Sequence, residues 1–119
     1  MTTSDPALSR VAQSEKERHA LSRLRQILNA PGLLRASLIQ MKKRCGKPYC
    51  RCAKAKRHWH LSWYMGQSQG GRPRMKYIPA ELLPEVQLWV DRFQEARKIL
   101  DDVSNENWNK IIRHTQKKR

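Results

Sequence analysis

The apolar residues of this chain repeat at two spacings, and each spacing predicts a different kind of element. From about Ser14 to Asn29 they recur every three or four positions, which predicts a helix that Pro31 and Gly32 end. A second helical stripe follows Pro84, a residue that a helix tolerates only in its first turn. This stripe predicts an amphipathic helix of about four to five turns that covers one face of a sheet. It consists of Val86, Trp89, Val90, Phe93, Ala96, Leu100 and Val103.

Between the two helices the pattern changes to that of strands. Residues 36–44 carry apolar side chains without a breaker and then turn cationic, which predicts a first strand. Residues 60–67 and 72–78 alternate, and the glycine-containing turn at 67–71 would join them into an antiparallel hairpin. Leu61, Trp63 and Met65 share one face of the second strand, while in the third Met75 and Tyr77 lie opposite Arg72, Arg74 and Lys76.

These elements predict an α+β fold. It has an N-terminal helix, a small antiparallel sheet of about three strands with a cysteine turn, a long C-terminal amphipathic helix and a short last helix. Residues 104–107 (SNEN) predict the break and new cap between the last two helices. We expect a disordered lead-in over residues 1–13, a single basic domain over 14–104, and a short helix with a basic tail over 105–119.

Charge is distributed unevenly along the chain. The formal net charge is +15, from 25 Lys and Arg against 10 Asp and Glu. No acid lies between residues 18 and 80, whereas 15 of the cations do, and the other 10 cations balance all the acids. Solvated surfaces normally mix the two signs because like charges repel, so this segment predicts a polyanionic partner such as nucleic acid. The three cations of the strand at 72–78 have an alternative explanation, because charged side chains on an edge strand discourage edge-to-edge aggregation.

The sequence does not favour a membrane partner. Binding to an anionic membrane surface would need an amphipathic helix with cations beside a broad apolar face, but the basic segment is rich in turns and strands. No apolar run reaches the length of a spanning helix, and the first residues lack the basic start and apolar stretch of a secretory signal. We expect a cytoplasmic protein, nucleoid-associated if its partner is DNA.

Three cysteines, Cys45, Cys50 and Cys52, precede His58 and His60. Three thiolates and one imidazole are the ligand number and type of a tetrahedral zinc site, with either histidine as the fourth ligand. Zinc or another metal would replace the apolar core that so small a chain lacks, although the C-x4-C-x-C spacing is not the usual paired C-x2-C. Two alternatives stay open: a tight turn with the cysteines packed as small hydrophobic residues, and a reactive thiol whose pKa nearby cations lower.

The distribution of acids also argues against catalysis. No carboxylate lies close in sequence to orient His58 or His60 beside a cysteine nucleophile. Metal-dependent phosphodiester cleavage needs carboxylates to hold hard cations, and Glu81 and Glu85 are better explained as residues at the positive end of a helix. We predict that the chain is not an enzyme.

Three runs of residues carry a family resemblance. Residues 45–53 (CGKPYCRCA), 60–64 (HLSWY) and 71–81 (GRPRMKYIPAE) resemble a small bacterial domain of unknown function that is often encoded among transposase genes. The resemblance covers roughly residues 33–103. Many members have a His-Gly-Pro-aromatic stretch after the cysteines, where this chain has HWHLS at 58–62. The resemblance implies a bacterial or phage mobile element as the setting, and no activity.

We therefore predict a nucleic-acid-binding accessory protein, DNA-binding and associated with a mobile element, that grips phosphates through a basic face at residues 35–76. Tyr64 and Trp59 would stack on the bases of a single strand. Two alternatives stay open: an RNA-binding zinc-knuckle protein, and a non-catalytic interaction subunit of a transposase or other nucleic-acid enzyme that docks through the helix at 85–103. The predicted contacts are Lys42, Lys43, Arg44, Lys47, Arg51, Lys54, Lys56, Arg57, Arg72, Arg74 and Lys76.

Overall fold

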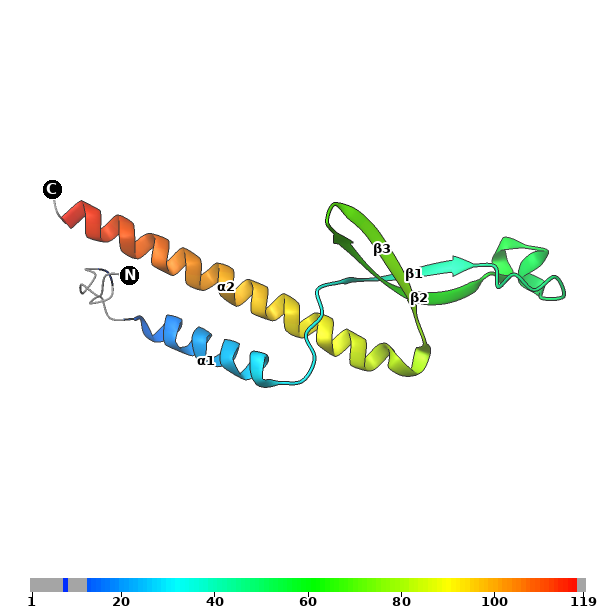
Figure 1. The fold of residues 1–119 in the computed structure, drawn as a ribbon, viewed down its shortest axis with the longest axis horizontal. Helices are drawn as coiled ribbons and strands as arrows, with labels where there is room; N and C mark the ends of the chain where they lie inside the picture. The colour runs from blue at the N-terminus through cyan, green and yellow to red at the C-terminus, as the bar shows by residue number, and fades with distance from the viewer. Residues whose placement is uncertain (1–7, 9–12, 118–119) are drawn as a thin grey trace. The chain divides into compact units, whose positions relative to one another are not determined.

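The computed structural model describes residue 8 and residues 13–117 of the chain. It has the expected α+β class, with an N-terminal helix, a three-stranded antiparallel sheet and a long C-terminal helix (Figure 1). Most of the expected lead-in at 1–13 and the last two residues of the basic tail lie outside the described residues. The elements are α1 (Glu15–Asn29), β1 (Ser37–Lys43), the 3-10 turns η2 (Arg51–Ala53) and η3 (Lys56–His58), β2 (His60–Gln69), β3 (Arg72–Ile78), the 3-10 turn η4 (Ala80–Leu82) and α2 (Leu83–Lys117).

The first helix begins and ends where the sequence predicts. The Ser14 side chain caps it by accepting a hydrogen bond of 3.0 Å from the Glu17 backbone amide, which satisfies one of the free donors of the first turn. The acids in that turn suit the positive end of the helix dipole.

The sheet has the order β1-β2-β3, with both pairs antiparallel. Gly70 and Gly71 join β2 to β3 at positive φ angles of 59° and 79°, which is the backbone of a tight hairpin turn that side chains with a Cβ rarely adopt. The register places Tyr77 opposite Tyr64, and Lys76 opposite Met65. The predicted division of β3 is therefore confirmed, with Met75 and Tyr77 on one face and the three cations on the other.

The last helix corrects one prediction. The expected break at 104–107 is absent, because α2 runs without interruption from Leu83 to Lys117 and includes residues assigned to a separate last helix. Serine and asparagine cost a helix only a few tenths of a kcal/mol relative to alanine. Val103 and Lys110, on either side of the expected break, both meet α1, so tertiary contacts outweigh that local cost.

The contacts divide the described chain into two compact groups. The first, which we call the helix pair, contains α1 and residues 94–117 of α2 (Figure 1). Its core is Ile27, Ala96 and Ile99. Within this group the second half of the α2 stripe packs on α1. The buried residue is Ile99, whereas the sequence pattern favoured Leu100, which is exposed.

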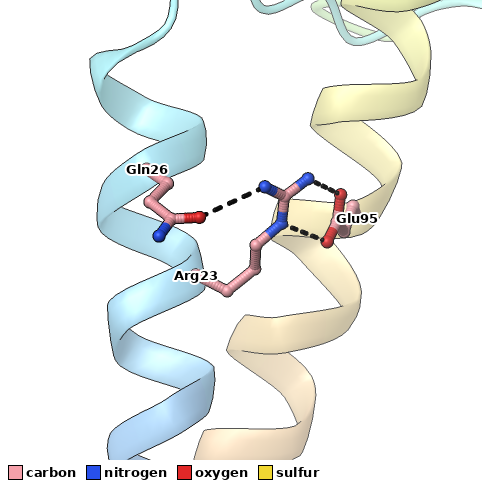
Figure 2. A network of polar contacts seen from close by, with 3 residues as sticks. All are labelled: Arg23, Gln26 and Glu95. Atoms are coloured by element: carbon pink, nitrogen blue, oxygen red, sulfur yellow. Dashed lines mark hydrogen bonds and ion pairs between the residues drawn. The ribbon is translucent and has the colours of Figure 1, made fainter.

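Two ion pairs also join the helices of this pair. Arg23 donates to both carboxylate oxygens of Glu95, from Nε at 2.7 Å and from Nη2 at 2.9 Å, and its Nη1 donates to Gln26 at 3.4 Å (Figure 2). Lys110 reaches Glu17 at 3.3 Å, and Glu17 is only 3% exposed. One pair is therefore solvated and the other lies inside the helix contact.

The second group, which we call the sheet unit, spans residues 33–93. Its buried apolar side chains are few, and among the described residues they include Ile78, Val90 and Cys52. The Leu34 amide donates to the Trp89 carbonyl at 3.1 Å and ties the segment before β1 to the first turns of α2. Across the described residues of both groups, no helix combines the length and the apolar character needed to cross a membrane.

Candidate metal centre and basic surface

The cysteine loop, residues 44–59, connects β1 to β2 and lies at the end of that strand pair (Figure 1). Gly46 turns the backbone at φ 85°, and the Cys50 amide donates to the Lys47 carbonyl at 3.2 Å. The chain then enters η2, where the Ala53 amide donates to the Cys50 carbonyl at 3.0 Å. This tight turn is what allows Cys50 and Cys52, separated by one residue, to point to a common centre.

Four side chains converge in this loop. The ligand atoms of Cys45, Cys50, Cys52 and His60 all lie within 4.8 Å of one another. The Cys45 and Cys52 sulfur atoms are 3.4 Å apart, and the Cys50 sulfur lies 3.2 Å from His60 Nε2. A tetrahedral zinc with Zn–S bonds of about 2.3 Å separates its sulfur ligands by roughly 3.8 Å. The four side chains are therefore compatible with a metal site, and in the described chain all three cysteines are free thiols.

The structure selects one of the two candidate histidines. His60 is the first residue of β2 and pairs with Lys43, the last residue of β1, so the register brings it next to Cys45. His58 lies in η3 outside the cluster, and its Nε2 contacts the Arg57 side chain at 3.3 Å. Of the two candidate histidines, the structure thus brings His60 and not His58 to the three cysteines.

The polar surroundings of the sulfur atoms favour a mixed thiol and thiolate set. The backbone amide of Cys52 first, and then the His60 side chain, lower the pKa of Cys50 to about 6. The Cys45 amide, which donates to the Cys52 sulfur at 3.3 Å, lowers the pKa of Cys52, but burial and the neighbouring thiols outweigh it and the net pKa is raised. Cys52 is only 1% exposed, so it is also the packing centre of the loop.

Cations hold the tryptophan of this loop. The Arg44 guanidinium lies 5.8 Å and the Lys56 ammonium 5.6 Å from the centre of the Trp59 ring. Such contacts stabilise a partly solvated site by about 0.5–1 kcal/mol each. The predicted base-stacking role of Trp59 therefore has to compete with two cations already against its ring, a contact that no sequence pattern indicates.

The predicted nucleic-acid contacts occupy two places in the sheet unit. The cations from Lys42 to Arg57 belong to the end of β1 and to the cysteine loop, and all are solvent-exposed, although Lys43, Arg44 and Lys56 also contact aromatic rings. Arg72, Arg74 and Lys76 are exposed along β3, and the register places them on the same face as Lys42. Because residues 33–78 contain no acid, no carboxylate of that stretch can neutralise them.

Hydrogen bonds to neutral groups orient two cations of this unit. Arg74 donates to the Gln67 side-chain oxygen from Nε at 2.8 Å and also from Nη2. Gln67 in turn donates to the Arg35 carbonyl, and Arg35 donates to the Ser68 carbonyl at 2.8 Å. Neutral acceptors hold these guanidinium groups in place without cancelling their charge.

Beside these cations is a groove of about 470 Å³. The sequence pattern did not indicate it, because it forms only when the segment before β1 meets residues of β2 and β3. It combines apolar walls with two cations. It is lined by Leu34, Ala36, Met65, Gly66, Gln67, Arg74, Met75 and Lys76.

A protein-family model matches residues 12–88, which include α1, the whole sheet and the four clustered ligands. The chain belongs to that family, the domain of unknown function DUF6788. The resemblance predicted a match over roughly residues 33–103. The DUF6788 match starts earlier, at residue 12, and stops earlier, at Leu88 in the first part of α2. No curated protein and no solved structure matches the chain.

Proposed function

We propose that this chain is a DNA-binding accessory protein that contacts phosphates through its sheet unit. The observation that carries the proposal is the sign of the charge. From residue 18 to residue 80 there are 15 cations and no acid, and most of them are exposed on the sheet and the cysteine loop. Each phosphate that such a surface neutralises releases condensed counterions, and this release drives binding.

Zinc is the metal that we propose for Cys45, Cys50, Cys52 and His60. Three sulfur ligands and one imidazole form a closed tetrahedral set, which leaves no open position for a substrate and is typical of structural sites. Bound there, the ion would tie the start of β2 to the cysteine loop. Its role is then to hold Lys47 and the other loop cations in a fixed arrangement, and we propose no catalysis by this chain.

The cations have different roles in this proposal. The β3 cations and those of the loop contact phosphates and so position the protein, while an arginine such as Arg72 can reach the edge of a guanine. Gln67 already orients the Arg74 side chain, so Arg74 loses less conformational entropy when it binds a phosphate.

A salt titration with matched variants tests the proposal. We expect the logarithm of the affinity for duplex DNA to fall linearly with the logarithm of salt concentration, and Lys76→Ala to weaken binding and reduce that slope by about 1. Lys98→Ala, which removes an exposed cation from the helix pair, is the control and should change neither. Fluorescence anisotropy with labelled duplexes measures both quantities.

An affinity that hardly changes with salt would refute phosphate neutralisation. Competition with duplex RNA in the same assay decides between the DNA proposal and an RNA-binding zinc-knuckle protein, because recognition of RNA helices depends on their shape and 2′-hydroxyl groups.

The setting that we propose is a bacterial or phage mobile element, with the protein in the cytoplasm and on the nucleoid. The resemblance in residues 45–81 supports this setting, since it is to a domain often encoded among transposase genes. Sequencing the neighbouring genes tests it: genes for mobile-element enzymes are expected beside this one.

One observation favours a second function, as an interaction subunit of a larger nucleic-acid enzyme. The apolar stripe of the helix at 85–103, which was expected to dock a partner, is largely packed within the chain, but another side of α2 in the helix pair carries exposed apolar residues. Trp108 is 66% exposed there, and Leu100, Ile111 and Ile112 accompany it at helical spacings. A pull-down that loses its partner on Trp108→Ala, with DNA binding unchanged, would support this function.

A further inference from the structure

The face of the sheet opposite the β3 cations carries an open aromatic surface, which we call the tyrosine face and define as Lys43, Tyr64, Met75 and Tyr77. The register aligns Ile39, Tyr64 and Tyr77 across the three strands. The two tyrosine rings meet edge to face, with centroids 5.9 Å apart and an angle of 69° between their planes. The Lys43 ammonium lies 4.8 Å from the centre of the Tyr64 ring.

The methionine and one tyrosine of this face are exposed although their side chains are largely apolar. Met75 is 50% and Tyr77 52% exposed. Gly66 lies next to them on the same face and adds no side chain to the surface. A Cβ there would lie 3.2 Å from Ile39 Cδ1 and 3.7 Å from Met75 Cγ. Exposed aromatic and methionine side chains in one place indicate a binding surface.

The charge around the tyrosine face identifies its ligand as an anion. Lys43 belongs to the face itself, and β3 is an edge strand whose alternate residues are Arg74 and Lys76. Tyr77 and Lys76 are therefore neighbours on opposite faces of the same free edge. A ligand that runs along β3 can place flat apolar groups on Tyr77 and Met75 and its negative charges beside the cations.

An unpaired nucleotide strand has this combination of groups. The faces of its bases are free, whereas in a duplex they are stacked on one another and cannot reach a protein ring. Base stacking on aromatic side chains together with a cationic track for the backbone is the usual means of binding single strands.

We propose that the tyrosine face binds single-stranded DNA by stacking bases on Tyr77 and Met75. This inference rests on the proposed function. It adds that the DNA is single-stranded and that the tyrosine face is the surface that recognises it. We assign DNA and not RNA because Ile39, beside the ring pair, has no hydrogen-bonding group for a ribose 2′-hydroxyl and the Met75 thioether is only a weak acceptor, and burying a poorly paired hydroxyl is unfavourable.

Three labelled probes separate stacking from phosphate binding in the full chain: oligo(dT), the same backbone with its bases removed, and a DNA duplex. We expect Tyr77→Ala to weaken binding to oligo(dT) by at least about fivefold, and to leave the abasic strand and the duplex unchanged. Tyr77→Phe keeps the ring and should bind as the original does. Lys76→Ala is the matched change on the other face and should weaken all three probes.

Equal affinity of the original chain for oligo(dT) and the abasic strand would overturn the stacking proposal while leaving phosphate binding intact. No salt-dependent affinity for any probe would instead remove the proposed function itself. Equal binding of oligo(U) and oligo(dT) would overturn the assignment to DNA. Self-association that Tyr77→Ala abolishes, with oligonucleotide binding unaffected, would assign the face to a second copy of the chain. Circular dichroism confirms that each variant is folded.

Discussion

The helix pair and the sheet unit are stabilised by different interactions. In the helix pair, apolar residues such as Ile27 and Ile99 form a core, and cations meet acids at Arg23–Glu95 and Glu17–Lys110. In the sheet unit, residues 33–78 contain no acid, and their cations contact tyrosine, tryptophan and neutral amide groups. Two cations of the helix pair are thus neutralised by acids of the same group, whereas residues 33–78 of the sheet unit have no acid among them and leave their charges available to the proposed partner.

This difference has a cost in stability. A small unit with few buried side chains and uncompensated positive charge gains little from burial and is opposed by self-repulsion. Cys52 is the buried centre of the cysteine loop, and with the proposed zinc bound, Cys52 and the other three clustered side chains would supply cross-links that apolar packing does not. We therefore expect the loss of one of the four clustered side chains to destabilise the sheet unit far more than the helix pair.

The largest effect is expected from Cys52→Ser or from a chelator. Because binding of a structural zinc contributes of the order of 10 kcal/mol to folding, we expect the amides of the cysteine loop and of the adjoining ends of β1 and β2 to exchange more than about tenfold faster, and DNA affinity to fall. Metal analysis and hydrogen exchange followed by mass spectrometry measure the two parts of this prediction.

His58→Ala is the matched control, since His58 lies in the same loop but outside the cluster, and it should keep the metal and the slow exchange. If hydrogen exchange in α1 accelerated as much as in the cysteine loop, the two groups would unfold together. The helix pair would then depend on the cluster as much as the sheet unit does.

An intermediate effect is expected in the helix pair from Glu17→Gln. This change leaves the Lys110 ammonium in a largely buried position without its carboxylate, and breaking a buried pair in this way costs about 3 kcal/mol. We expect a lower midpoint of urea unfolding and faster exchange in α1. Replacing both residues with leucine should recover most of the loss, because no unpaired charge is left inside the helix contact.

Unchanged stability of Glu17→Gln would show that water reaches Lys110 and that the helix pair does not depend on internal charge pairing. DNA binding should be unaffected by either change, because both residues lie in the helix pair.

The smallest effect is expected from Arg23→Gln, which removes the ion pair with Glu95 drawn in Figure 2, because both side chains of that pair are solvated. Hydrogen bonds from Arg23 lower the pKa of Glu95 from its ordinary value of 4.5. The pair therefore stabilises the fold above pH 4.5, and this contribution is lost as the pH falls through the lower pKa of the folded state. Between neutral pH and pH 3, the thermal unfolding temperature of Arg23→Gln should fall slightly less than that of the original chain. Added salt should reduce this difference.

Much of the fold could be predicted from local patterns alone. Alternation along residues 72–78 places Met75 and Tyr77 opposite the three cations, because successive side chains of a strand point to opposite faces whatever surrounds it. Ser14 and Gly71 mark a helix start and a turn through their own backbone and side-chain chemistry. The three cysteines with a nearby histidine likewise indicate metal chemistry from residue type alone.

Other features depend on which elements meet. The choice between His58 and His60 follows from the β1–β2 register, and the pairing of Tyr64 with Tyr77 follows from that of β2 with β3. Ile99 is buried in place of Leu100 because α2 meets α1 in this group, and the same contact carries α2 through the predicted break.

The sequence by itself therefore determined the fold class, the two faces of the third strand and the uncompensated positive charge, since each depends on residues close together in the chain. The tertiary structure decided which histidine joins the cysteines, which side of α2 is buried and which aromatic rings form the tyrosine face. Those outcomes depend on strand register and helix contact, where residues far apart in sequence compete for the same neighbours and a shift of one position changes every contact.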